Sequence, residues 1–406
     1  MMRILTLGCG GVGANATKQM AARHPEIEYV VADLNIDTAQ HLAHDLAGCA
    51  RPLRVDVHDR QSLNVACEGV DLIFNAAGPY YRNAAPVIDM AIEKRIDYID
   101  VNDDHDVAEN LFGDSEFMAR VAAAGIRMVV GCGFAPGMTN VMARYAADRL
   151  DRVEAIRLAL AVPFVPTLFT PAILEHMFHI TAGTVTQVID GIRQQVPGWS
   201  GERIVQFAEP FGAYPAYYFG HGETVTLAHF MPGVKEVSNR LAFMPKSGSD
   251  KWRTLIEQGF ASTSPLDDLG FSPARYIAHH MKSVSAKAYF SPDLSTGPNG
   301  YSNQVEVEGF RNGDRVSITC EVHGSMSEER FEKGKRSLEL DTTPTCARIG
   351  MEAFLRNEVQ GQGLLAPEVS FEPEAFIREV LEASQLTMHM KETIIRCDLR
   401  QISTSG

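Results

Sequence analysis

The hydrophobic positions in the first third of the chain form short apolar runs separated by segments with helical spacing. Six of these runs have the length and composition of strands, and they lie at residues 4–7, 27–32, 53–57, 72–75, 98–101 and 127–130. Strands that alternate with helices are typical of parallel neighbours, because a parallel pair needs a long, right-handed crossover. The pattern therefore predicts an α/β fold with a Rossmann-type doubly wound parallel sheet, whose ligands bind beyond the carboxyl ends of the strands.

The pattern changes from about Asp151. Proline and aromatic residues become more frequent, and apolar runs follow one another without regular helical segments between them. The clearest piece is 303–322, where apolar residues alternate on both sides of Asn312-Gly313, which is a strong hairpin signal. These features predict a second domain of the α+β class.

The first apolar run leads into a glycine-rich loop. Gly8, Gly10 and Gly13 have the spacing G-x-G-x-x-G, which allows a tight turn, the approach of a pyrophosphate and close helix packing. The second run ends at Asp33, twenty residues after Gly13, where an acidic side chain binds the adenosine ribose hydroxyls. Together these elements predict a dinucleotide site. The expected contacts in the loop are Gly8, Gly10, Gly11, Val12 and Gly13.

The residues after the second strand favour NAD over NADP. Asp33 is followed by Leu34 and Asn35, without an arginine or lysine immediately after it. A 2′-phosphate would meet the Asp33 carboxylate with no compensating cation. We therefore expect NAD as the cofactor, bound at Asp33 and Leu34.

Two more strand ends are expected to border the dinucleotide. Asp56 and Val57 follow the third strand and would flank the adenine, although Asp56 is explained equally well as a helix cap. The small residues Ala76, Ala77 and Gly78 follow the fourth strand. They would let the backbone approach the nicotinamide ribose.

Composition narrows the partners and the compartment. A chain of 406 residues exceeds what one core usually serves, so two domains are expected. The formal net charge of −14 disfavours binding to nucleic acid or to an anionic membrane. The seven cysteines are scattered without a C-x-x-C pair, which is typical of free thiols. Since neither a secretory signal nor a membrane-spanning run is found, we expect a cytoplasmic protein.

Several phrases together resemble the saccharopine dehydrogenase-like family. They are Gly-Cys-Gly-Gly-Val-Gly at 8–13, Asn-Ala-Ala-Gly-Pro-Tyr at 75–80, Asp-Tyr-Ile-Asp-Val-Asn at 97–102, Phe-Ala-Pro-Gly-Met-Thr-Asn at 134–140 and Gly-Leu-Leu-Ala-Pro-Glu at 363–368. The resemblance spans nearly the full chain. Within the family, the chain is more similar to the saccharopine reductase and lysine 6-dehydrogenase branch than to the carboxynorspermidine dehydrogenase branch, which usually has a different phrase after the fourth strand.

The resemblance implies a domain division and a reaction. Residues 1–137 and 338–392 would form the Rossmann domain, 138–337 the α+β substrate and dimerisation domain, and 393–406 a C-terminal tail. The family transfers hydride reversibly between a nicotinamide and the carbon of a C–N bond. This implies an amino-acid oxidoreductase of saccharopine, lysine or a related amine, acting in lysine or other amino-acid metabolism, with a homodimer as the expected assembly.

Polar residues at the end of the fifth strand are the candidate catalytic groups. Asn102, Asp103, Asp104 and His105 follow that strand and open a helix. Asp104 is expected to cap the helix, which leaves Asp103 as the preferred base for a substrate amine and His105 as the next candidate. Hydride transfer can also proceed largely by positioning and electrostatics.

Candidate substrate contacts are spread along the chain. A second glycine cluster at 131–137 has the spacing G-x-G-x-x-x-G and no following acid, so it is not a second nucleotide motif. The helix after it begins near Thr139 and Asn140, which would receive a substrate carboxylate or simply start the helix. Arg240 would bind that carboxylate or pair with a buried acid. Tyr80, after the fourth strand, completes the set.

Other chemistries are disfavoured. His176-x-x-His179 is one residue shorter than H-E-x-x-H and lacks its glutamate, so we expect these histidines on a helix face and no metal site. Walker and G-x-S-x-G motifs are also absent. Two alternatives stay open. One is a sensor or regulatory protein that binds NAD without turnover. The other is a dehydrogenase of a carbonyl or alcohol, for which a Tyr-x-x-x-Lys pair would be expected and is not found.

Overall fold

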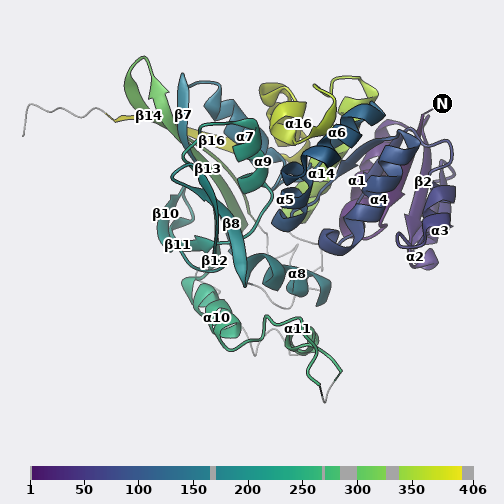
Figure 1. Cartoon of the computed structure of the whole chain (residues 1–406), viewed down its shortest axis with the longest axis horizontal. Coiled ribbons are helices and arrows are strands. Elements are labelled where there is room, and N and C mark those ends of the chain that lie inside the picture. Colours follow the sequence, from purple (N-terminus) through teal and green to yellow (C-terminus); the bar gives the residue numbers. More distant parts are fainter. Residues whose placement is uncertain (1, 165–170, 268–269, 284–299, 326–337, 396–406) are drawn as a thin grey trace, which may run out of the picture.

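A parallel sheet with helices on both faces forms the N-terminal part of the molecule (Figure 1). In the computed structural model, which describes residues 2–164, 171–267, 270–283, 300–325 and 338–395, this sheet has the strand order β15-β6-β5-β4-β1-β2-β3. Every strand pair in it is parallel. The predicted Rossmann-type α/β fold is therefore confirmed. The strands are β1 Arg3–Leu7, β2 Glu28–Asp33, β3 Ala50–Arg54, β4 Leu72–Asn75, β5 Asp97–Asp100, β6 Arg127–Val129 and β15 Gly363–Leu365.

Alternation along the strands explains the two helical layers. Ile4 of β1 packs in one apolar cluster and Leu5, its neighbour, in another. Successive side chains of a strand point to opposite faces, so both faces of this sheet must be covered. The helices of this part are α1 Gly11–Arg23, α2 Ile36–Asp45, α3 Arg60–Ala66, α4 Tyr80–Lys94, α5 His105–Gly113, α6 Ser115–Ala124, α14 Leu338–Leu355, α15 Pro367–Ser370 and α16 Pro373–Ser384.

A larger mixed sheet forms the second part. Its main path is β10-β11-β12-β7-β13-β14-β16, and β8 and β9 branch from β12. β7 pairs with β12 in parallel and with β13 in antiparallel orientation, so the predicted α+β class is confirmed. The predicted hairpin is β13–β14, and its turn residues Asn312 and Gly313 have φ angles of 54° and 85°. The remaining elements are α7 Met138–Ala147, β7 Arg152–Pro163, α8 Pro171–Thr181, β8 Thr184–Ile189, β9 Ile192–Pro197, β10 Arg203–Phe207, β11 Gly212–Tyr218, α9 Glu223–Phe230, β12 Glu236–Met244, α10 Lys246–Glu257, α11 Pro273–Ser283, β13 Gly300–Arg311, β14 Asp314–Ser325 and β16 Thr387–Ile395.

The C-terminal part of the chain contributes to both sheets. β15 extends the parallel sheet beside β6, whereas β16 pairs with β14 of the mixed sheet from Arg315↔Ile395 to His323↔Thr387. The expected assignment of 338–392 to the Rossmann domain and of 393 onward to a tail is therefore wrong for residues 387–395. This segment buries few side chains, so its backbone pairing left no apolar pattern to detect. Residues 396–406 of the expected tail lie outside the described residues.

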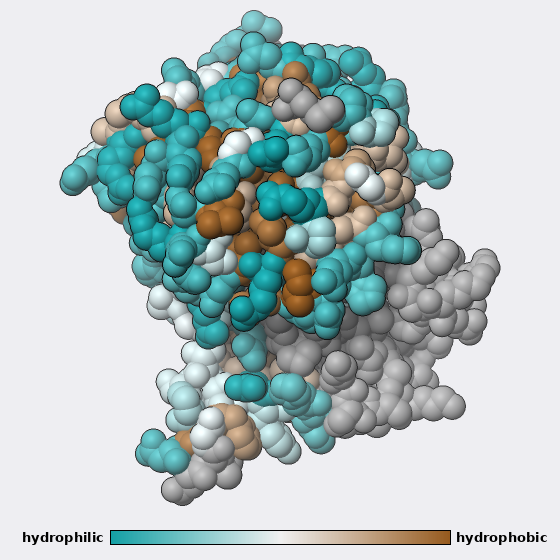
Figure 2. All heavy atoms as spheres, turned by 90° about the vertical axis from the view of Figure 1, so that its right-hand side faces the viewer, coloured by the Kyte–Doolittle hydropathy of each residue, from teal (hydrophilic) through white to brown (hydrophobic). Residues whose placement is uncertain are grey.

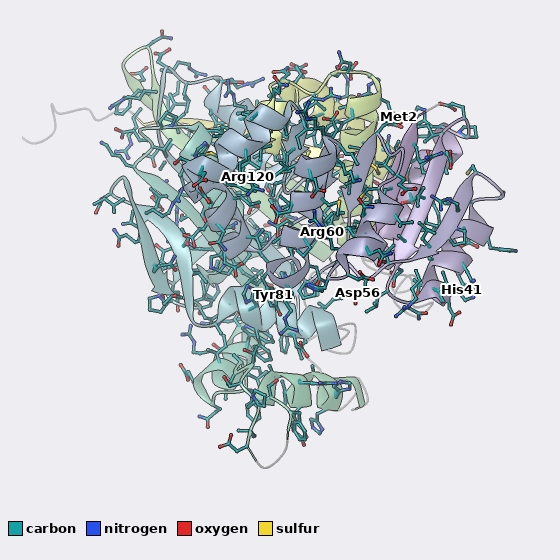
Figure 3. All side chains as sticks on the ribbon, turned by 45° about the vertical axis from the view of Figure 1, so that its right-hand side comes forward. Met2, His41, Asp56, Arg60, Tyr81 and Arg120 are labelled. Atoms are coloured by element: carbon teal, nitrogen blue, oxygen red, sulfur yellow. The ribbon has the colours of Figure 1, made fainter. Side chains whose placement is uncertain are left out.

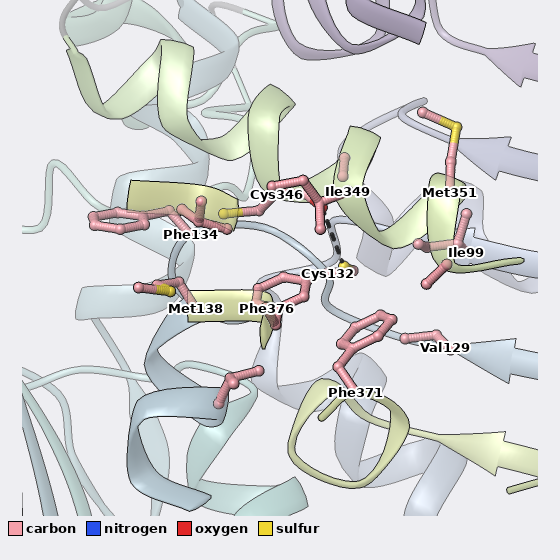
Figure 4. Close-up of a cluster of buried hydrophobic side chains, with 14 of the residues drawn as sticks. Ile99, Val129, Cys132, Phe134, Met138, Cys346, Ile349, Met351, Phe371 and Phe376 are labelled. Carbon is pink, nitrogen blue, oxygen red and sulfur yellow. Dashed lines mark hydrogen bonds between the residues drawn. The ribbon is translucent and has the colours of Figure 1, made fainter. Parts of the chain in front are cut away.

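One buried cluster runs through both sheets. It joins Ile4 and Tyr29 of the parallel sheet to Val305 and Ile318 of the mixed sheet. Figure 4 shows its central part, where Phe134 and Met138 meet α14 and α16, and where Cys132 donates a hydrogen bond to the Cys346 carbonyl oxygen at 3.7 Å. Because the two sheets share this core, the proposed domain division separates sheets rather than independent cores.

Figure 2 shows one face of the Rossmann half as mostly hydrophilic, with scattered apolar residues. Among the described helices, none combines the length and apolarity that crossing a bilayer requires.

A buried carboxyl group lies where the C-terminal return meets α7. The Oε2 atom of Glu368 accepts a hydrogen bond of 3.0 Å from the Asn140 side chain, which also donates to Thr226 at 3.0 Å. The other oxygen, Oε1, accepts none. Burial raises the pKa of Glu368 from its ordinary value of 4.5 to about 7. The folded protein therefore holds this proton more tightly than the unfolded chain does.

We expect Glu368→Gln to remove a pH dependence of stability. The folded pKa lies above the unfolded one, so the contribution of Glu368 is fully present below pH 4.5 and is lost as pH rises through about 7. The difference corresponds to at most about 3 kcal/mol. Urea unfolding at several pH values should show the variant gaining stability relative to wild type as pH rises. The exposed Glu382→Gln is the control, and a constant difference across pH would contradict the assignment.

Candidate active site

The loop after β1 lies directly against the backbone that follows β4. A Cβ atom on Gly8, whose φ is +87°, would sit 2.5 Å from the carbonyl oxygen of Ala76. A Cβ atom on Gly13 would sit 1.9 Å from the Gly8 oxygen, whereas Gly10 has nothing within 4 Å. Gly8 and Gly13 are thus fixed by packing. Gly10 borders open space at the start of α1, which fits the approach of a pyrophosphate to the amides of Gly11 and Val12.

Asp33 is held at the end of β2 by two backbone amides. Its carboxylate accepts hydrogen bonds from Cys9 at 2.8 Å and from Asn35 at 2.9 Å. These bonds tie the acid to the glycine loop. Leu34, which follows it, is 59% exposed. The arrangement fits the binding of ribose hydroxyls beside the loop, as the sequence predicts.

The ends of β3 and β4 lie on the same side of the sheet as this loop. Asp56 accepts a hydrogen bond from the amide of His58 at 2.9 Å, and Asp59, not Asp56, caps α3. The helix-cap interpretation of Asp56 is therefore wrong, and a contact of Asp56 and Val57 with the adenine stays a prediction. Ala77 donates to the Asn75 side chain at 3.1 Å, which shapes the Ala76–Gly78 turn.

Helix α8 brings two histidines to the carboxyl edge of the sheet. Figure 3 shows Tyr81 and Asp56 at this edge, with Met2 at the opposite one. His176 Nε2 lies 3.0 Å from Asp103 Oδ2, and His176 Nδ1 lies 3.2 Å from Asp104 Oδ1. The imidazole therefore stands between two carboxylates from the end of β5.

This arrangement fixes the charges of Asp103 and His176. Burial opposes the charged form of His176, but the two carboxylates outweigh it and raise its pKa to about 10. Burial likewise opposes the charge of Asp103, but the His176 charge dominates and lowers the pKa of Asp103. Asp103 is an anion at neutral pH, with a side chain that is 32% exposed. It stays the proposed base.

Asp104 does not cap α5 as expected. It occupies the N-cap position but makes no side-chain capping bond; instead its Oδ2 accepts a hydrogen bond of 2.9 Å from the Tyr81 amide. The Tyr81 ring stacks on His179 at a centroid distance of 4.2 Å. The carboxylate thus connects the loops after β4 and β5.

Two predicted site residues are buried away from the crevice. His105 is 5% exposed, and a Cβ on Gly220 would sit 2.2 Å from its Nδ1 atom, so it is packed between the two parts of the molecule. Burial also lowers the pKa of His105. Tyr80 is 7% exposed and donates to the Asn75 carbonyl oxygen at 3.2 Å. The catalytic role of His105 and the substrate contact of Tyr80 stay predictions, and neither enters the mechanism proposed below.

The other predicted substrate ligands are also bonded within the protein. Thr139 and Asn140 are fully buried, and Thr139 donates to Glu223 at 2.8 Å. Arg240 donates to the Gly201 carbonyl oxygen and the Ser238 hydroxyl, at 3.0 and 2.8 Å. Its guanidinium stacks over the Tyr218 ring. These side chains have partners inside the protein, and their contact with a substrate stays a prediction.

The site residues that the sequence did not predict come from α8 and from the first turns of α4 and α5. They are His176, His179, Tyr81 and Asp106, of which only the two histidines have a recognisable spacing in the sequence. Residues three apart lie on one side of a helix, so the spacing itself was the available signal. The spacing alone could not show that these histidines pair with the loop after β5, which lies more than seventy residues earlier in the chain.

Known proteins resemble this chain in sequence and in fold. Residues 4–125 match the family model described as the saccharopine dehydrogenase NADP binding domain. The structure superimposes on apo histidine-tagged saccharopine dehydrogenase (L-Glu forming) from Saccharomyces cerevisiae with a TM-score of 0.68 and 15% identity, covering 97% of this chain and 100% of that one. The predicted resemblance to the saccharopine dehydrogenase-like family is confirmed.

Curated relatives cover nearly the whole chain. Carboxyaminopropylagmatine dehydrogenase from Synechocystis sp. is 24% identical over 94% of this chain and 96% of its own length. Carboxynorspermidine synthase from Vibrio alginolyticus is 22% identical over 96% of this chain and 97% of its own. Neither carries the name of the saccharopine reductase and lysine 6-dehydrogenase branch, so that branch stays a prediction. A nicotinamide dinucleotide is the supported cofactor, and the choice between NAD and NADP is open.

We expect Gly13→Ala to lower the stability of the protein and Gly10→Ala to weaken dinucleotide binding. Ala at 13 overlaps the Gly8 oxygen, so the variant should lose about 1–3 kcal/mol of stability. Ala at 10 meets no protein atom and should keep stability within about 1 kcal/mol, while weakening dinucleotide binding by about tenfold or more. Thermal melts and NADH fluorescence titrations measure both. Unchanged binding in a folded Gly10→Ala variant would place the pyrophosphate elsewhere.

Proposed function

We propose that this chain is an NAD-dependent oxidoreductase acting on the C–N bond of an amine that carries a carboxylate. One observation carries the proposal: the Asp103–His176 pair lies at the same carboxyl edge of the sheet as the glycine loop and Asp33. Ligands of such sheets bind at this edge, where the strand order reverses between β1 and β4. A reactive amine held there would have a charged acid–base pair beside the nicotinamide.

The names of similar proteins support the substrate class. Saccharopine, carboxyaminopropylagmatine and carboxynorspermidine each combine amine nitrogen with a carboxylate. For this chain we propose saccharopine, lysine or a related amine of this kind. We also propose that the active form is a cytoplasmic homodimer, because the family resemblance implies association.

The residues of the site divide the work of the reaction. Asp33 would hold the adenosine ribose, and Ala76, Ala77 and Gly78 would leave space for the nicotinamide ribose. A nicotinamide held there would supply or accept a hydride. Asp103 takes the proton from the substrate amine, or returns it to the nitrogen in the reverse direction. His176 is a positioning residue that fixes the Asp103 carboxylate.

A substrate panel tests the proposal. The full-length protein is incubated with NAD or NADH and with amino acids, carboxylated polyamines, 2-oxo acids and aldehydes, and NADH absorbance is followed in both directions. We expect turnover with one amine–carboxylate class. Turnover only with alcohols or ketones would favour the carbonyl alternative, and cofactor binding without any turnover would favour a sensor or regulatory protein.

Replacing Asp103 with Asn tests the proposed base. We expect kcat to fall by about 10²–10⁴-fold with little change in NADH affinity, because the Asn side chain keeps the shape and loses the proton acceptor. Asp114→Asn, on the exposed start of α6, is the matched control. Wild-type turnover in the Asp103→Asn enzyme would remove Asp103 from the mechanism.

Replacing Asp33 with Ser and Leu34 with Arg should shift the cofactor preference toward NADP. The double variant removes the carboxylate that opposes a 2′-phosphate and adds the missing cation. Binding of NADH and NADPH is compared by titration in both proteins. If wild type already prefers NADPH, the prediction of NAD is wrong. Arg54, exposed and paired in register with Asp33, would then be the compensating cation.

A further inference from the structure

A group of donor atoms beside the Asp103–His176 pair converges on a single point. His179 Nε2 lies 3.8 Å from Asp104 Oδ1 and 3.4 Å from Asp106 Oδ1. The three atoms lie within 4.8 Å of one another. Ligands of a first-row metal ion, each about 2.0–2.2 Å from the ion, are separated by about 3–4 Å. These separations match a coordination set, and of the two only the 3.4 Å contact between His179 and Asp106 is also a hydrogen bond, and a long one.

One of these atoms is a buried acceptor without a hydrogen bond. The Asp104 side chain is fully buried, and its Oδ1 accepts no hydrogen bond in the described structure. The orientation of this carboxylate is fixed, because its Oδ2 atom accepts a hydrogen bond from the Tyr81 amide. The His176 Nδ1 atom lies 3.2 Å from this oxygen as an ion pair without hydrogen-bond geometry. A buried carboxylate oxygen that accepts no hydrogen bond is a candidate ligand for a bound cation.

The neighbouring pair has a different geometry. His176 offers Nε2 to Asp103 and Nδ1 to Asp104, so its ring lies between two carboxylates and its nitrogens point apart. No single ion could take both nitrogens of one ring. His179 presents one nitrogen to both oxygens, as a metal ligand does.

Charge balance favours the same conclusion. Across the described residues, Asp104 and Asp106 form ion pairs with histidines and with no lysine or arginine. The charge of His176 is shared with Asp103. Asp104 and Asp106 thus bring two carboxylates to one point with no lysine or arginine of the described residues beside them, and a divalent ion would balance these carboxylates.

We propose that Asp104, Asp106 and His179 bind a divalent transition-metal ion, such as Zn²⁺ or Mn²⁺. One imidazole and two carboxylates form a mixed donor set that suits these ions better than Mg²⁺ or Ca²⁺, which take oxygen ligands alone. His176 and Tyr81 are positioning residues. His176 lies against the ligand oxygen of Asp104, and the Tyr81 ring stacks on His179.

The site keeps coordination positions open toward the crevice. The side chains of His179 and Asp106 are 24% and 39% exposed. Open positions on such an ion would take water or a carboxylate. If the proposed function holds, the carboxylate of the substrate is the natural ligand, because Asp103 lies in the same loop and faces the substrate amine. Spacing within one helix could not predict this site, because its ligands come from α8, from α5 and from the residue before α5.

Metal binding is tested on the full-length, tag-free protein without cofactor or substrate. After treatment with EDTA and dialysis, ZnCl₂ and MnCl₂ are titrated calorimetrically, and bound metal is counted by mass spectrometry. We expect saturation near about one ion per chain. Asp106→Asn and His179→Gln should each lower the affinity by about 10–100-fold, and both alter partly exposed side chains, so that folding is preserved. Thermal melts confirm the fold.

Two matched controls separate this site from alternatives. The double variant His44→Gln/Asp45→Asn removes an exposed pair with the same 3.8 Å separation and should bind as wild type does. Asp103→Asn removes an equal charge from the same loop without removing a ligand, so it should weaken binding less than Asp106→Asn does.

Two results would overturn the proposal. One is binding of less than a tenth of an ion per chain at saturating metal. The other is an affinity that responds to Asp103→Asn as strongly as to Asp106→Asn, which would mean general attraction by charge. Because the readout needs neither NAD nor turnover, its failure is distinct from failure of the proposed oxidoreductase activity.

Discussion

The arrangement of the site depends on a backbone contact between the end of β1 and the end of β4. Gly8 lies so close to Ala76 that any side chain at position 8 would overlap the Ala76 carbonyl group. The contact brings the glycine loop against the small residues that follow β4. It also leaves the loop amide of Cys9 free to hold Asp33. The crevice, its polar edge and the start of α1 all take their positions from this contact.

Features set by local sequence could be predicted. The glycines at 8, 10 and 13 and the acid at 33 follow from the geometry of one βαβ unit, in which every constraint acts within about thirty residues. The Asn312-Gly313 turn was equally accessible, since a two-residue turn with positive φ angles permits few residue types. The class of both sheets follows from such units.

Features set by contacts between distant parts of the chain could not be predicted from the sequence. Arg240 and Asn140 have the chemistry of ligands, and only the fold shows that internal acceptors already satisfy them. The role of His176 and His179 becomes visible only with their partners Asp103, Asp104 and Asp106, which follow β5 of the parallel sheet. β16 is held by backbone pairing with β14, and the pattern of side chains does not reveal which strand is its partner.

The return of the C-terminal segment has a consequence for how the protein acquires its structure during synthesis. α1 packs against α14, and β15 forms the edge of the sheet beyond β6, so residues at both ends of the chain complete one core. A nascent chain that has emerged only as far as β6 lacks these partners and exposes the apolar surface they will cover. The molecule therefore depends on late, long-range closure, which is slow and leaves the early half exposed to aggregation until α14 and β15 have been synthesised.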